Sequence, residues 1–184
     1  MNRSKLWVAL MGGTAILVFG QLASAATLQT RAEYSAAVDR ASLEFKDARA
    51  KCEPLAGHAK DMCVVEAQAV EKRAKASAEA NYKGTTESRT DSQIANADAD
   101  FMIAKVACDT KTDQEEDVCV KEAQATRVRL VADAKAHKTA VDAQADAHAD
   151  TRDAQYKVAL AKCDAMSGTK KDTCVTSANS AYGK

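Results

Sequence analysis

Apolar residues recur in alternating steps of four and three along three segments of the chain, which is the spacing of one face of an α-helix. Each stripe ends on a cysteine, with an aromatic residue seven positions before it and an alanine four positions before it. The stripes are Tyr34, Val38, Ala41, Phe45, Ala48 and Cys52; Ile94, Ala97, Phe101, Ala104 and Cys108; and Ala145, Ala149, Arg152, Tyr156, Ala159 and Cys163. The pattern predicts three helices with a narrow buried face, which only Arg152 interrupts.

A second cysteine follows eleven residues after the first in every segment, and four residues later the stripe resumes with an alanine. The pairs are Cys52 and Cys63, Cys108 and Cys119, and Cys163 and Cys174, and their first cysteines are 56 and 55 residues apart. Helix-breaking or polar residues lie between the cysteines of each pair, namely Pro54 and Gly57, residues 110–114, and Gly168. The spacing predicts a threefold repeat of a helical hairpin, whose first helix ends at one cysteine and whose second begins at the other.

The first 25 residues have the three parts of a cleavable secretory signal. Residues 2–5 are polar and basic, residues 6–20 are an apolar run, and residues 23–25 are a small-residue cleavage site. The run is shorter than the ~20 residues of a membrane-spanning helix, and no second run follows it. We therefore expect export to the periplasm, cleavage before Ala26 and no membrane span afterwards; an uncleaved anchor helix is the alternative.

Composition favours thin helices over a deep core. Alanine, the best helix former, accounts for 40 of 184 residues, whereas Leu, Ile, Val and Phe together account for 21 of the 159 residues after the signal. The 26 basic and 26 acidic residues balance, which argues against a nucleic-acid-binding protein. The predicted fold class is all-α: an elongated array of three disulfide-stapled helical hairpins around a thin, Ala-rich core, with hairpin repeats at 26–83, 84–140 and 141–184.

An even number of cysteines in an exported chain with a weak core predicts disulfides. Pairing within each hairpin is favoured, because three twin-cysteine helices could not all be cross-linked to one another in pairs. Each bond would close a loop of about 12 residues, worth roughly 3 kcal/mol in the chain-entropy estimate. A zinc site is the other alternative, although zinc thiolates favour closer spacing.

The connections between hairpins differ. Gly84 is placed to end one helix, with a threonine behind it to start the next. Residues 132–150 contain eight alanines and neither glycine nor proline, so one helix is expected to run unbroken from about residue 114 to residue 164, about 75 Å at 1.5 Å per residue. Thr112 with Glu115, and Thr169 with Asp172, resemble capping boxes.

No catalytic motif or cofactor fingerprint is recognisable. His137 and His148 lie eleven residues apart on the long helix, about 16 Å, too far to share one metal ion. His58 is expected to be exposed in a turn. The sequence therefore assigns no catalytic, cofactor-binding or metal-binding residue, and predicts a protein that is not an enzyme.

The signal, the Ala/Lys/Asp-rich helices and the repeated segments Asp61-Met62-Cys63-Val64-Val65-Glu66-Ala67 and Asp117-Val118-Cys119-Val120-Lys121-Glu122-Ala123 resemble small exported proteins of Gram-negative bacteria labelled TolA-like cell-envelope proteins. The resemblance implies a structural or interaction role in the envelope, with a protein partner. A periplasmic chaperone or stress-response binder is the alternative function. The partner's identity and the oligomeric state are left open.

Overall fold

The computed structural model describes residues 28–184, and within that range the regular structure is entirely helical. The helices are α1 (Arg31–Cys52), α2 (Gly57–Lys83), α3 (Thr86–Cys108), α4 (Asp113–Asp164) and α5 (Thr169–Tyr182). The predicted all-α fold of disulfide-stapled hairpins is confirmed. The predicted signal and its cleavage site lie outside the described residues.

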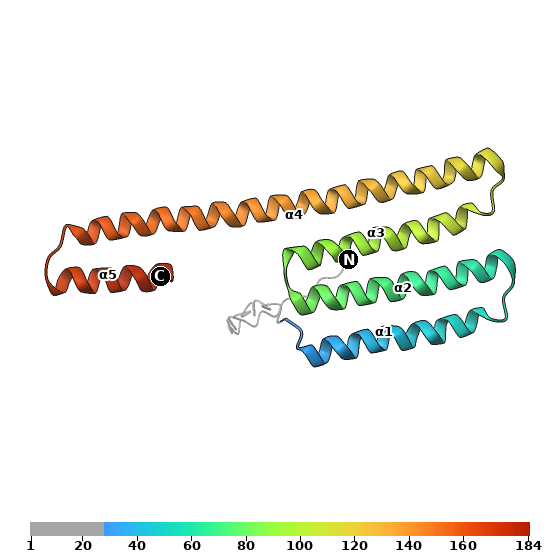
Figure 1. Ribbon diagram of the computed structural model, residues 1–184, viewed down its shortest axis with the longest axis horizontal. Coiled ribbons are helices and arrows are strands. Elements are labelled where there is room, and N and C mark those ends of the chain that lie inside the picture. Colours follow the sequence, from blue (N-terminus) through green and yellow to red (C-terminus); the bar gives the residue numbers. More distant parts are fainter. Residues whose placement is uncertain (1–27) are drawn as a thin grey trace, which may run out of the picture.

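The helices form an open layer rather than a closed bundle (Figure 1). Helices α1, α2, α3 and the first half of α4 lie side by side and antiparallel, and the second half of α4 extends beyond them and carries α5. Among the described helices, α1 contacts α2, α2 contacts α3, α3 contacts α4 and α4 contacts α5, and no other pair is in contact. The layer is therefore one helix thick, and both of its broad faces are open to solvent.

Small side chains fill the spaces between these helices. Apart from Val65, the buried hydrophobic residues of the described chain are alanines and the first cysteine of each pair. The aromatic positions of the stripes are only half-buried, whereas Ala41 and Ala97 are buried. This thin core confirms the predicted Ala-rich interior. It buries little apolar area, so the helices depend on additional links.

The second cysteine of each pair lies deeper in its helix than the sequence predicts. Cys63 and Cys119 each lie six residues after the first residue of their helix, and Cys174 lies five residues after Thr169. Short turns allow the second helix to begin early. The disulfide then joins positions at the same height on two antiparallel helices, which a cysteine at the helix start would overshoot.

Helix α4 is continuous, as predicted. Its 52 residues span about 78 Å at 1.5 Å per residue. Neither α4 nor any other helix within residues 28–184 carries an apolar stretch long enough to cross a membrane.

Both predicted capping boxes are wrong, and one that the sequence analysis missed is present. Thr112 precedes α4, but its side chain accepts no capping hydrogen bond, because the chain enters this helix through Asp113 at φ 47°. Thr169 lies inside α5, and Gly168 occupies the cap position without a side chain to accept. At α1 the Thr30 backbone N–H donates to the Glu33 carboxylate at 2.7 Å, and this bond lowers the pKa of Glu33.

Gly84 ends α2 in the left-handed conformation, as predicted. Its φ is 64°, and its backbone N–H donates to the Ala80 carbonyl at 2.9 Å. Thr85 then caps α3, because its hydroxyl oxygen accepts the Ser88 backbone N–H at 3.0 Å. This turn lets α3 fold back along α2.

The Gly84→Ala substitution is expected to lower the free energy of unfolding by about 1 to 2 kcal/mol, the cost of a left-handed L-residue. The added Cβ would also meet the Leu28 side chain. Urea denaturation followed by circular dichroism measures the loss. Asn81→Ala, an exposed change near the end of the same helix, is the control and is expected to change stability by less than about 0.5 kcal/mol. Equal effects of the two substitutions would contradict the conformational argument.

Candidate functional site

The disulfide pairing within each hairpin is confirmed. Cys52 bonds Cys63, Cys108 bonds Cys119 and Cys163 bonds Cys174, with Cα atoms 5.6, 5.7 and 5.5 Å apart. All six cysteines lie in the described residues, and none is free. Three disulfides indicate an oxidising, exported environment.

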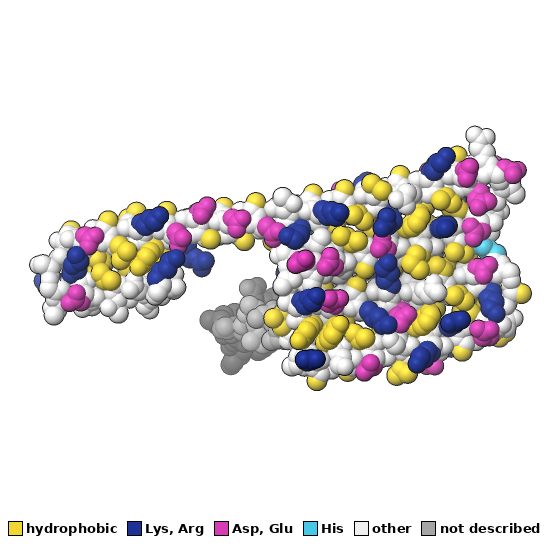
Figure 2. Space-filling model, viewed as in Figure 1, with side chains coloured by type: hydrophobic (Ala, Val, Ile, Leu, Met, Phe, Trp, Pro, Cys, Tyr) yellow, Lys and Arg dark blue, Asp and Glu magenta, His cyan; other side chains and the backbone are white. Residues whose placement is uncertain are grey.

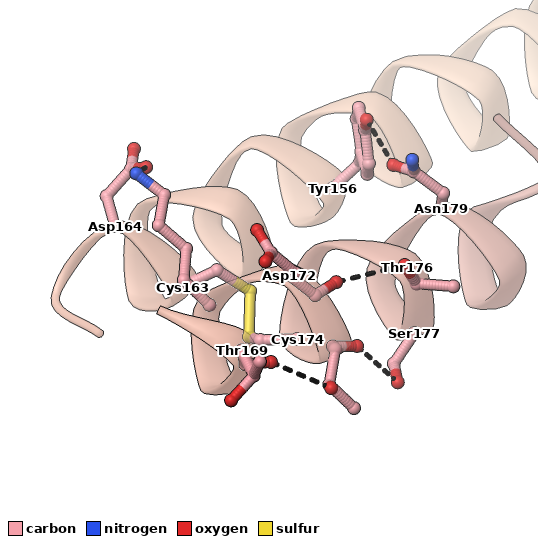
Figure 3. Close-up of a disulfide and its surroundings, with 11 residues drawn as sticks. Tyr156, Cys163, Asp164, Thr169, Asp172, Cys174, Thr176, Ser177 and Asn179 are labelled. Atoms are coloured by element: carbon pink, nitrogen blue, oxygen red, sulfur yellow. Dashed lines mark hydrogen bonds and ion pairs between the residues drawn. A yellow bond between two sulfur atoms is a disulfide. The ribbon is translucent and has the colours of Figure 1, made fainter. Parts of the chain in front are cut away.

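The third disulfide supports the least extensive hairpin (Figure 3). Tyr156 on α4 donates its hydroxyl hydrogen to Asn179 Oδ1 on α5 at 2.7 Å, and Lys171 and Asp164 form an ion pair of 2.9 Å across the turn. Helix α5 has 14 residues and contacts α4 alone. A helix of this length is marginal by itself in water. Its position therefore depends strongly on the bond between Cys163 and Cys174.

One carboxylate links the three central helices. Asp98 on α3 accepts from Lys72 of α2 at 3.0 Å through Oδ2, and from Arg127 of α4 at 2.6 Å through Oδ1. Partial burial alone would raise the pKa of Asp98. The two hydrogen bonds and positive charges outweigh that effect, so the pKa lies below its ordinary value.

A second ion pair joins α2 and α3 on the opposite face of the layer. Arg73 pairs with Asp100, next to Lys72 and two residues beyond Asp98 respectively. Two residues correspond to about 200° around a helix, so Asp98 and Asp100 point to opposite faces. The helices are thus clamped on both sides by charge, and their contact surface is filled by small residues. Sequence analysis did not identify this cluster, because the partners are 26 to 29 residues apart.

The Asp98→Asn substitution is expected to lower the free energy of unfolding by about 1 to 2 kcal/mol, because two basic side chains lose one partially buried acceptor. Asp100→Asn, which removes one exposed pair, is the matched control, with an expected loss below about 0.5 kcal/mol. The Asp98 pKa is lower in the folded state, so its contribution is present above the unfolded-state pKa of aspartate and is lost as pH falls through the folded-state pKa. Denaturation at pH 7 and pH 3 should show the deficit of the Asp98→Asn variant only at pH 7.

Grooves run between the two helices of each hairpin at equivalent places. The first has a volume of 380 Å³, the second 130 Å³ and the third 490 Å³, and the same alanine of the repeat lines each of them: Ala48, Ala104 and Ala159. On the face in view, Figure 2 shows hydrophobic side chains gathered between α1 and α2 and between α4 and α5. The equivalence follows from the 56- and 55-residue repeat offsets, and the repeat spacing was the sequence signal that could have located these grooves.

The first groove is the most apolar at its base. Phe45, Ala48 and Val70 line it, with Glu44 and Lys51 at its rim, and Val70 is 56% exposed. An open groove of this kind fits an apolar side chain presented by another protein, with charged groups around it. It does not enclose a substrate.

The histidines are dispersed. His137 is exposed at the edge of a groove between α3 and α4, and His148 is exposed on the part of α4 beyond α3. The expectation for His58 is wrong: it lies in the first turn of α2 and is half-buried, because that helix begins at Gly57. Within residues 28–184 no three His, Cys, Asp or Glu side chains are grouped as a metal site.

Comparison with known proteins identifies no relative: no family model, curated protein or solved structure matches the chain. The repeated hairpin, its disulfide and its groove are therefore the observations on which a function is proposed.

Proposed function

We propose that this chain is a non-enzymatic structural or interaction protein of the cell envelope, exported to the periplasm by its N-terminal signal. The single observation that supports this most is the one-helix-thick layer, in which every helix contacts only its chain neighbours. Such an array offers far more surface for its volume than a globular domain. Its disulfides preserve that surface in an oxidising compartment.

The sequence supports the same proposal. Residues 1–25 have the composition of a cleavable signal, and the repeated segments around Cys63 and Cys119 resemble TolA-like envelope proteins. In this proposal the grooves between paired helices receive apolar side chains of a protein partner. The ionic pairs between α2 and α3 keep the array in a fixed shape while it does so.

Site-specific photo-crosslinking in the periplasm tests the proposal. A photoreactive residue in place of Val70, in the first groove, is expected to capture one reproducible protein partner. The same residue in place of Leu43, which is 60% exposed and outside the described grooves, is the control and should not capture it. Retention of the chain in the cytoplasm, or a catalytic turnover abolished by substitution of one side chain, would overturn the proposal.

A periplasmic chaperone is the second candidate, favoured by the three equivalent grooves and by the exposed Val70 and Val158 that line two of them. A chaperone would suppress aggregation of an unfolded client at near-stoichiometric amounts, and the Val70→Lys and Val158→Lys substitutions would weaken suppression. Absence of suppression by the oxidised protein would reject this candidate and leave the first untouched.

A further inference from the structure

One side of α4 has no partner along its whole length. Helices α3 and α5 both lie along the same side of α4 (Figure 1). The opposite side carries a stripe at steps of three and four, here called the outer stripe, and every member is exposed. It consists of Ala125, Val128, Ala132, Ala136, Thr139, Ala143, Ala147, Asp150, Ala154, Lys157 and Ala161.

The repeat shows what covers this stripe elsewhere in the molecule. Adding 56 residues moves Ala69 and Ala80 of α2 onto Ala125 and Ala136. Adding 55 moves Ser88 and Ala99 of α3 onto Ala143 and Ala154. In the first two repeats these residues are buried, with exposures of 0, 8, 4 and 0% respectively, where α2 and α3 pack together. The outer stripe is thus two copies' worth of one established helix interface, left unpaired.

The reason is the missing turn. Gly84 lets α3 fold back along α2, and the equivalent position near Ala140 is inside the continuous α4. The third hairpin therefore cannot reach the outer side of the second hairpin in its own chain. Both surfaces that such folding would join remain on one helix and face the same way.

Charge favours antiparallel pairing of two such helices. Residues 121–140 contain five basic and two acidic residues, whereas residues 142–161 contain two basic and four acidic residues. An antiparallel pair centred near residue 141 places each basic half against an acidic half. The register of Lys72 and Asp98, carried over by the repeat offsets, sets Ala132 near Asp150 and Arg129 near Asp153.

We propose that a second copy of this chain covers the outer stripe, with the two α4 helices antiparallel about a twofold axis near residue 141. The third hairpin of each copy then extends the layer of the other. The interface repeats the contact between α2 and α3 twice, along the ~78 Å of α4. It is isologous and therefore closes at two copies. This inference is independent of where the protein works.

Light scattering coupled to size exclusion tests it on the oxidised, exported chain. The expected mass is that of two copies. Ala132→Glu, which brings a negative charge near Asp150 of the second copy, is expected to raise the dissociation constant at least tenfold and yield a single-copy mass. Combining Ala132→Glu with Asp150→Lys makes these charges opposite and is expected to restore the dimer.

Ala145→Glu is the matched control. Ala145 is exposed on the same helix, two residues from Ala147 and so about 200° around from the outer stripe, and the variant should remain dimeric. Circular dichroism checks that each variant keeps its helical content. If Ala132→Glu disturbs folding, Asp150→Lys alone must show weakened association. A single-copy mass for the unmodified chain, a dimer unaffected by Ala132→Glu, or equal dissociation by Ala145→Glu would overturn the proposal.

Discussion

Reduction of the three disulfides is expected to unfold most of residues 28–184 at 37 °C. Each bond closes a loop of about 12 residues, and the chain-entropy estimate for one such loop is roughly 3 kcal/mol. The bonds lie in separate hairpins, so their effects should add to about 9 kcal/mol. A domain of this size has a total stability of only about 5 to 15 kcal/mol. With alanine as its main buried residue, this layer has little else to offset the loss.

Thermal unfolding followed by circular dichroism, with and without reductant, measures this effect. A loss of about 9 kcal/mol corresponds to a fall in melting temperature of about 20 to 35 °C for a chain of this length. Replacing the cysteine pairs by serine one at a time is the control. Loss of the third pair is expected to release α5 alone, because α5 contacts only α4. A melting temperature that changes by only a few degrees on reduction would contradict the argument.

The features predicted correctly from the sequence are those with local causes. The helix ends at Cys52 and Cys108, the left-handed Gly84 and the unbroken α4 each follow from residues close by in the chain. Disulfide partners could be assigned because each pair is only eleven residues apart. The predicted capping boxes failed because backbone geometry at Asp113 and Gly168 decides whether a threonine can reach an amide.

The features that were missed depend on positions distant in the chain. No local pattern distinguishes Asp98, which bridges Lys72 and Arg127, from the other solvated acids on these helices. The open layer was not predicted either. A narrow apolar stripe fits a closed bundle equally well, and only the contacts between whole helices show that each has at most two neighbours. The grooves follow from that arrangement, so they too were outside local reasoning.

Transplanting the turn of the first repeat into α4 is expected to convert the extended molecule into a compact one. The variant replaces residues 139–141 with Lys-Gly-Thr-Thr, the sequence of residues 83–86. This restores the 45-residue interval between Cys63 and Cys108, which is 44 residues between Cys119 and Cys163. Glycine would supply the left-handed residue that ends the helix, and the threonine behind it would cap the next. The third hairpin should then pack on the outer stripe of its own chain.

Small-angle X-ray scattering measures the result as a shorter maximum dimension, because a helix of about 78 Å is replaced by two of about 40 Å or less. Light scattering should give a single-copy mass, since the stripe is now covered from within. The matched control carries Lys-Ala-Thr-Thr at the same place. Alanine favours the helix over the left-handed conformation, so this variant should stay extended. Unchanged dimensions of the glycine variant would mean that the faces of α4 are not equivalent to those joined between α2 and α3.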